Sequence, residues 1–152
     1  MMIESIKDKG RVIATIVYKN FDKPGIEFLT PDTFPLQLGH MKHPSGHVIE
    51  PHVHNPFRRD TYGTQEVLFI KKGIIQINFY SFDKDYLESR ILHEGDFILL
   101  VGAGHGIKII EEATLVEVKN GPYYPEKDKE RFEDKTVDSH IPFIQNKDTF
   151  TE

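Results

Sequence analysis

The chain has 152 residues, no cysteine and a formal net charge of −5. This length fits one domain with a full hydrophobic core, and the lack of cysteine excludes a disulfide framework. Acidic balance without a basic stripe argues against nucleic acid as a partner, and the apolar runs are far shorter than the roughly 20 residues of a membrane helix. The first residues form no apolar export segment, so we expect a cytoplasmic protein without membrane contact.

Short runs rich in Val, Ile, Phe and Tyr recur between Gly, Pro, Asn and Asp residues, which is the pattern of an all-β chain. The runs at 66–72 and 74–82 predict a hairpin that turns at Lys71-Lys72-Gly73, because Gly takes the positive φ of a tight reversal. So many short strands favour a sandwich or a barrel. In chain order the expected strands cover residues 12–18, 34–43, 47–54, 66–72, 74–82, 86–92, 97–101, 105–110 and 114–119.

The composition changes after Gly121-Pro122, where charged residues become frequent. We expect a short helical or irregular tail there, with a helix within residues 123–132. The chain is therefore interpreted as a single domain over residues 1–152, with a barrel core over about 34–119 and a C-terminal extension over 120–152. Residues 138–152 mix apolar and polar side chains, and the sequence leaves open whether they dock on the barrel.

Four of the possible metal ligands stand out among the side chains of this β-rich block. His52 and His54 are two residues apart, so on a strand their imidazoles point to the same face. Glu66 and His105 lie at strand starts further along the chain. Imidazole nitrogen and carboxylate oxygen suit Zn, Fe, Mn, Ni or Cu, and without cysteine no thiolate ligand competes. The remaining histidines are expected to be surface or hydrogen-bonded residues.

The spacing around these residues resembles the first motif of the cupin superfamily, which reads Gly, five residues, His-x-His, three or four residues, Glu, six residues, Gly. Here Gly46 precedes His52 by the required spacing, His54 completes the His-x-His, and Glu66 precedes Gly73 as the motif asks. The segment between His54 and Glu66 is longer than in the motif. We interpret it as an extended loop, because the entropic cost of closing a loop grows only with the logarithm of its length.

The second cupin motif reads Gly, five residues, Pro-x-Gly, two residues, His. Gly95 and the stretch Gly102-Ala103-Gly104-His105 match this motif in part. The proline is missing, and the spacing from Gly95 to His105 is one residue shorter than in the motif. The resemblance spans residues 46–118, about half of the chain. It implies a double-stranded β-helix (jelly-roll barrel) in which His52, His54, Glu66 and His105 hold one divalent transition metal per chain, with Fe, Mn, Ni and Zn left open.

The long loop also offers candidates for substrate binding and catalysis. Arg58 and Arg59 can clamp a phosphate or carboxylate through bidentate hydrogen bonds. Tyr62, Glu50 and His47 lie near the expected site and are candidates for acid or base. Each of these residues also fits the plainer interpretation of a solvated loop residue.

Three functions follow from these patterns. The first is a metal-dependent enzyme of isomerase or oxygenase type, acting on a sugar, sugar nucleotide or oxoacid in carbohydrate metabolism. The second is a metal-free sugar-nucleotide isomerase or epimerase, in which a histidine moves protons next to a keto group. The third is a non-catalytic cupin that binds or senses a small ligand. Because both faces of the strand at 66–72 are apolar, with Val67 and Phe69 on one of them, we also expect a homodimer.

Overall fold

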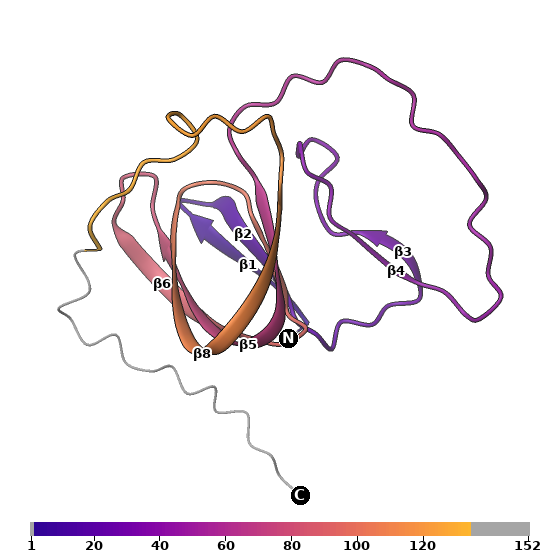
Figure 1. The fold of residues 1–152 in the computed structure, drawn as a ribbon, viewed down its shortest axis with the longest axis horizontal. Coiled ribbons are helices and arrows are strands. Elements are labelled where there is room, and N and C mark those ends of the chain that lie inside the picture. The colour runs from indigo at the N-terminus through magenta and orange to yellow at the C-terminus, as the bar shows by residue number, and fades with distance from the viewer. Residues whose placement is uncertain (1, 135–152) are drawn as a thin grey trace, which may run out of the picture.

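The computed structural model describes residues 2–134, and within this range the chain is all-β (Figure 1). Every strand pairing is antiparallel. No helix in the described range is long and apolar enough to cross a membrane. The strands are β1 (Ile3–Asp8), β2 (Arg11–Val17), β3 (Gly25–Phe28), β4 (Gly39–Lys42), β5 (Glu66–Tyr80), β6 (Tyr86–His93), β7 (Phe97–Leu100) and β8 (Gly104–Lys119).

The main sheet has the strand order β1-β2-β7-β5-β6, and β8 pairs with the same long strand β5. It curls into half of a barrel around an aliphatic core (Figure 1). The register explains the core, because residues directly opposite each other on antiparallel strands point to the same face. Ile98 of β7 lies opposite Ile16 of β2 on one side and Leu68 of β5 on the other, and all three are buried.

A polar cluster joins the two ends of this strand order. Arg90 of β6 donates from Nη2 and Nε to Oε1 of Glu4 on β1, at 2.7 and 3.0 Å, and the Tyr18 hydroxyl donates to Oε2 of Glu4 at 2.7 Å. The hydrogen bond from Arg90 lowers the pKa of Glu4, with the Tyr18 bond adding to it and burial opposing it. The curl of the sheet is therefore held by a charge-assisted contact between its outer strands.

The predicted hairpin at Lys71-Lys72-Gly73 is wrong, because β5 continues without reversal from Glu66 to Tyr80. Its pairing with β8 shifts register between Ile70 and Ile75, so the extra residues form bulges that bend the ribbon. Gly73 has a φ of 87°, and a Cβ there would lie 2.1 Å from the Glu112 carbonyl oxygen. The glycine thus permits a bend and a close approach of two backbones rather than a turn.

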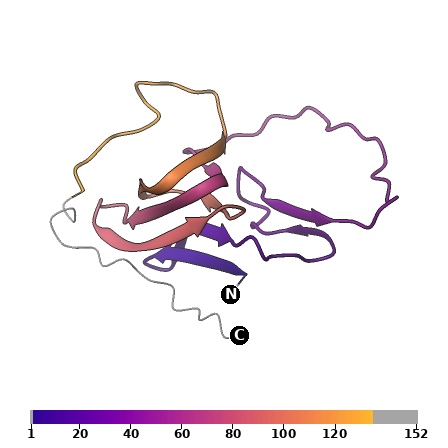
Figure 2. The same ribbon diagram turned by 60° about the horizontal axis from the view of Figure 1, so that its bottom comes forward.

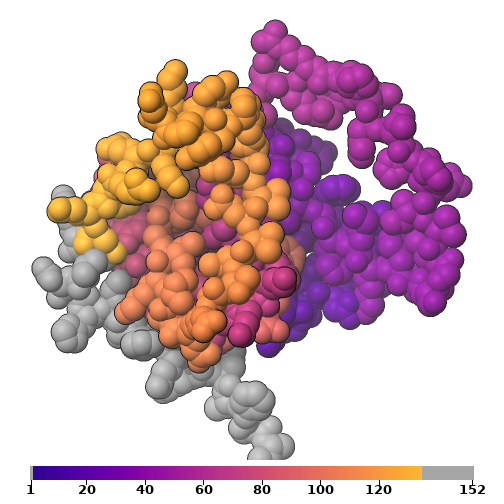
Figure 3. Space-filling view, in the orientation of Figure 1, coloured from indigo at the N-terminus to yellow at the C-terminus, as the bar shows by residue number. Residues whose placement is uncertain are grey.

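The strand predicted at 47–54 is also wrong, since this segment belongs to a loop in which every residue from 44 to 63 is exposed. Pro44, Pro51 and Pro56 interrupt it, and proline has no N–H for a strand ladder. We call residues 44–63 the arch. Figures 1, 2 and 3 show it bowing away from the sheet, beside the small two-stranded sheet of β3 and β4.

Several other expectations have clear outcomes. The strands predicted at 12–18, 86–92 and 97–101 are confirmed to within a residue or two as β2, β6 and β7. Those at 105–110 and 114–119 join into the single strand β8, and the one at 34–43 shrinks to residues 39–42. β1 and β3 were not predicted. The helix expected within 123–132 is absent, because this segment forms a turn and extended chain. The expectation for residues 138–152 falls outside the described range.

Candidate functional site

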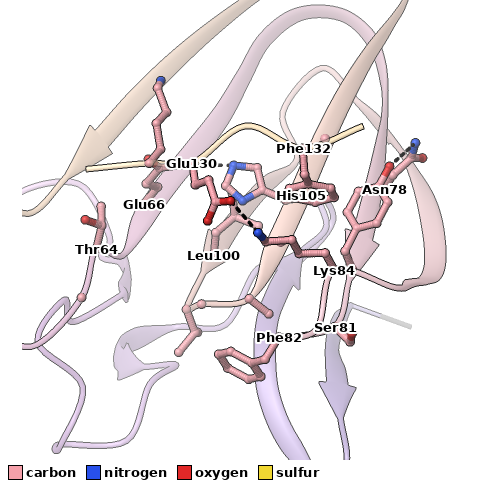
Figure 4. A pocket seen from close by; sticks show the side chains of 18 of the residues that line it. Thr64, Glu66, Asn78, Ser81, Phe82, Lys84, Leu100, His105, Glu130 and Phe132 are labelled. Atoms are coloured by element: carbon pink, nitrogen blue, oxygen red, sulfur yellow. Dashed lines mark hydrogen bonds and ion pairs between the residues drawn. The ribbon is translucent and has the colours of Figure 1, made fainter. Parts of the chain in front are cut away.

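A broad cleft of about 1390 Å³ opens at one end of the curled sheet. It is lined by the two ends of the β5–β8 ribbon, by the turns that precede β6 and β8, and by the chain after β8. Figure 4 shows Glu66 and His105 inside it, with Lys84 and Glu130 nearby. The cleft is the place where polar and titratable side chains from distant parts of the sequence converge, which is typical of a ligand site.

Glu66 is the first residue of β5, and its position is fixed by the backbone on either side. The Gln65 N–H donates to Oδ1 of Asn120 at 2.7 Å, and the Asn120 side chain donates to the Gly63 carbonyl at 3.1 Å. Gln65 itself is buried, and its Oε1 accepts a hydrogen bond from the Leu36 N–H. By strand alternation Glu66 then points the other way and lines the cleft.

His105 enters the cleft from the start of β8, after a turn in which Ala103 has a φ of 62°. Gly104 is required next to it, because a Cβ there would lie 2.9 Å from Cβ of Tyr80 and 3.0 Å from the ring of Phe132. The small residue lets the chain pass close under these two aromatic rings. The glycine-rich turn seen in the sequence thus delivers the imidazole to the cleft.

His105 and Glu66 form a pair across the mouth of the curled ribbon, with 3.5 Å between Nε2 and Oε2 (Figure 4). Glu66 is the more shielded of the two, with 17% of its side chain exposed against 33% for His105. Burial lowers the pKa of His105 below its usual value, the carboxylates of Glu66 and Glu117 oppose this shift, and the charge of Lys129 adds to it. The imidazole is therefore neutral at neutral pH and can accept a proton.

Lys119, at the end of β8, holds the other oxygen of Glu66. Its Nζ lies 3.9 Å from Oε1 of Glu66 and 2.9 Å from Oδ2 of Asp128. It also lies 4.5 Å from the centre of the Tyr123 ring. The register that sets Lys119 opposite Glu66 makes this contact a direct consequence of strand pairing. Glu66 is thereby oriented between a lysine and a histidine.

The chain after β8, residues 120–134, passes along the cleft, and we call it the strap. The Glu130 carboxylate pairs with Lys84 at 2.7 Å, and Asp128 accepts from the Thr64 hydroxyl at 3.2 Å. Phe132 packs edge-on against the Tyr80 ring with 5.1 Å between centroids. The strap, in orange and yellow in Figures 1 and 2, therefore forms one wall of the cleft.

A buried polar network lies at the far side of the cleft. Oδ1 of Asn78 accepts hydrogen bonds from Gln76 at 2.8 Å and from the Ser89 hydroxyl at 2.7 Å. The Tyr80 hydroxyl donates to Asp134, and burial together with this bond raises the pKa of Tyr80 to about 12. Tyr80 therefore stays protonated at neutral pH.

Compared with protein-family models, with curated proteins and with solved structures, the chain has no match. The site must be interpreted from its own geometry.

The structure brings together Glu66 and His105, two of the four expected metal ligands, and leaves His52 and His54 on the exposed arch. The rings of His52 and His54 lie 5.2 Å apart, and Nδ1 of His52 lies 2.9 Å from the Glu50 carbonyl oxygen. Among residues 2–134, no three His, Asp or Glu side chains are grouped so that they could hold a metal ion. In this arrangement the four side chains do not fit one ion, and the metal site stays a prediction.

The expected substrate and catalytic residues of the long loop lie on the arch, away from the His105–Glu66 pair. Arg58 pairs with Asp60 at 2.9 Å and is 87% exposed, and Arg59 stacks on the Phe57 ring at 3.6 Å. His47 stacks on His43 with 4.0 Å between ring centres. Glu50 is exposed. Tyr62, fully exposed, is the one of these candidates that reaches the rim of the cleft.

Sequence reasoning missed Lys119 and the strap as parts of the site. The alternation of Glu117 and Lys119 at the end of a strand places both on one face. This signal was available in the sequence, but the partner strand that brings them to Glu66 was not.

Proposed function

We propose that this protein is an enzyme that binds a small polar molecule in the cleft, such as a sugar, sugar nucleotide or oxoacid, and moves a proton with His105. The observation that carries the proposal is the 3.5 Å contact between His105 and Glu66 at the mouth of the cleft. A neutral imidazole next to a carboxylate is a typical general base, and the carboxylate stabilises the imidazolium that forms. The reaction class is isomerisation or epimerisation at a carbon next to a carbonyl.

In this reaction His105 removes the proton from that carbon, leaving an enolate whose charge lies on the carbonyl oxygen. In an isomerisation the proton then returns from the imidazolium to the neighbouring carbon, whereas an epimerisation takes a proton from a second acid on the opposite face of the same carbon. Glu66 lies between Lys119, which faces its Oε1, and His105, which faces its Oε2, so its carboxylate is placed next to the imidazolium that forms. Tyr80, which keeps its proton at neutral pH, belongs to the same cleft.

The resemblance to the cupin superfamily remains part of this proposal. A curled antiparallel sheet and the meeting of Glu66 with His105 support it, and the full double-stranded β-helix is its finer expectation. Fold alone does not fix chemistry, and the support for the reaction is the His105–Glu66 pair.

The experiment is proton exchange in heavy water. Keto sugars, sugar nucleotides and oxoacids are incubated with the full chain in D₂O, and loss of the signal of the proton next to the carbonyl is followed by NMR. We expect exchange of at least one of these compounds, and His105→Gln should slow it by roughly 10²- to 10⁴-fold. His93→Gln, a histidine of β6 that does not line the cleft, is the matched control. Exchange that persists in His105→Gln would refute the proposal.

The metal-dependent enzyme is the second candidate, because two of its four ligands do meet in the cleft. His52 and His54 lie on the arch, and within residues 2–134 the four predicted ligands do not surround a common ion. Elemental analysis of the purified chain tests it directly. About one equivalent of Fe, Mn, Ni or Zn, lost in the double variant His52→Ala/His54→Ala, would favour this candidate over the first.

A further inference from the structure

The charges that line the cleft are unevenly paired. Each carboxylate among the lining residues already has a partner of opposite or donating character. The contacts are Glu66 with His105 and Lys119, Glu117 and Asp128 with Lys119, Glu130 with Lys84, and Asp134 with the Tyr80 hydroxyl. Each carboxylate among the described lining residues thus has a contact, and Lys119 is shared by three of them.

Three cations of the strap are in the opposite situation. Lys127, Lys129 and Arg131 line the cleft and are exposed, and within residues 2–134 none of them has an ion pair with a carboxylate. We call these residues the basic trio. The chain as a whole has a net charge of −5, whereas the residues that line the cleft include six Lys or Arg and five Asp or Glu, so the cleft departs locally from the acidic balance of the chain.

The basic trio and the reactive pair line the same cleft. His105 and Glu66 contribute to its wall from the two ends of the β5–β8 ribbon, and the trio contributes from the strap. The trio and the pair therefore belong to one site. A ligand that touches His105 at one end can therefore reach the trio at the other.

We propose that the basic trio binds an anionic group of the substrate, a phosphate or a carboxylate, while the reacting carbon lies at His105. This inference rests on the proposed function and names its substrate class. The guanidinium of Arg131 supplies a planar fork that matches the anion, and the two lysines add compact charges. The role that the sequence suggested for Arg58 and Arg59 thus falls to residues of the strap.

The test uses inorganic phosphate as the probe and the full chain with assigned NMR signals. We expect phosphate, and not sodium chloride at equal ionic strength, to shift the amide signals of residues 127–131 and the imidazole signal of His105. In the triple variant Lys127→Gln/Lys129→Gln/Arg131→Gln the affinity should fall at least about tenfold.

The matched control is the triple variant Lys7→Gln/Lys71→Gln/Lys72→Gln, which removes the same charge from exposed positions outside the cleft. Its phosphate affinity should stay within about twofold of the unchanged chain. Equal losses in both triple variants, or no specific shift at residues 127–131, would overturn the inference. Because all six positions are exposed, both variants should fold, which the dispersion of the same spectra verifies.

The outcomes separate this inference from the proposed function. If phosphate binding needs the basic trio but exchange in D₂O does not need His105, the anion site stands and the proposed function fails. If exchange needs His105 but phosphate binding ignores the trio, the proposed function stands and this inference fails.

Discussion

The curled β5–β8 ribbon and the arch both carry histidine and glutamate at suggestive spacings, yet only the ribbon gives them defined positions. From Glu66 to Tyr80 the strand β5 is paired on β8, so the side chain of each residue has a fixed direction. The arch has exposed residues throughout and proline where a ladder would need donors. A chemical motif therefore has structural meaning only where a neighbouring strand holds it.

The largest effect expected from this contrast concerns two glycines with similar backbone angles. Gly73 in the ribbon has a φ of 87° and Gly46 in the arch has a φ of 82°. A Cβ at Gly73 would lie 2.1 Å from a backbone oxygen, whereas a Cβ at Gly46 would have nothing within 4 Å. Gly73→Ala should therefore lower the free energy of unfolding by roughly 2–4 kcal/mol, and Gly46→Ala by about 1 kcal/mol.

Urea unfolding of both variants measures this difference. Similar losses for the two substitutions would show that the ribbon backbones do not approach as closely at the bend as described.

A smaller effect is expected from two ion pairs. Glu4 on β1 is shielded by Arg90, whereas Asp60 on the arch is 80% exposed beside Arg58. Glu4→Gln should cost about 1–2 kcal/mol of unfolding free energy, and Asp60→Asn less than about 0.5 kcal/mol.

The pH dependence of the free energy of unfolding tests the contribution of Glu4 separately. The pKa of Glu4 is lowered from 4.5 in the folded chain by Arg90 and Tyr18, so its ionisation stabilises the fold above pH 4.5. This contribution is lost as the pH falls below that value towards the folded pKa. The free energies of unfolding of the unchanged chain and of Glu4→Gln should therefore converge as the pH is lowered from 7 to 3. A difference between them that stays constant with pH would exclude the role of Glu4.

The smallest expected effect is on the association of two folded chains into a dimer. Phe69 lies opposite Val116 on the outer face of the ribbon, next to the pair Val67 and Val118, and these side chains remain partly or largely exposed. We predict that this face forms a homodimer. Sedimentation should show a dimer that Phe69→Lys weakens, while Phe57→Lys on the arch leaves it unchanged. A monomer at every concentration would contradict the prediction.

The sequence predicted the elements whose patterns are local. The apolar and β-branched runs of β2, β6 and β7 predicted these strands correctly, since each run lies between turn residues. The segment around His52 and His54 was predicted as a strand on similar grounds, but strand formation needs a partner that the sequence does not reveal. Gly73 was interpreted as a turn because a positive φ serves a reversal and a bulge equally.

The candidate site was partly predictable for a similar reason. Glu66 and His105 each belong to a motif that includes nearby glycines, and the structure brings the two side chains together. Lys119 has only its alternation with Glu117 as a local signal, and the basic trio has none, because their positions depend on the register between β5 and β8 and on the course of the strap. Long-range pairing decides these contacts, and one sequence contains little information about it.

The most direct test of the His105–Glu66 pair is an NMR titration of the histidine ring protons. His105 should titrate below the usual value of about 6.5, and Glu66→Gln should lower its pKa further, because the Glu66 carboxylate raises it in the intact site. The signals of His52 and His54 should not respond to that substitution. A His105 signal that ignores Glu66→Gln, or arch histidines that respond to it, would contradict the account.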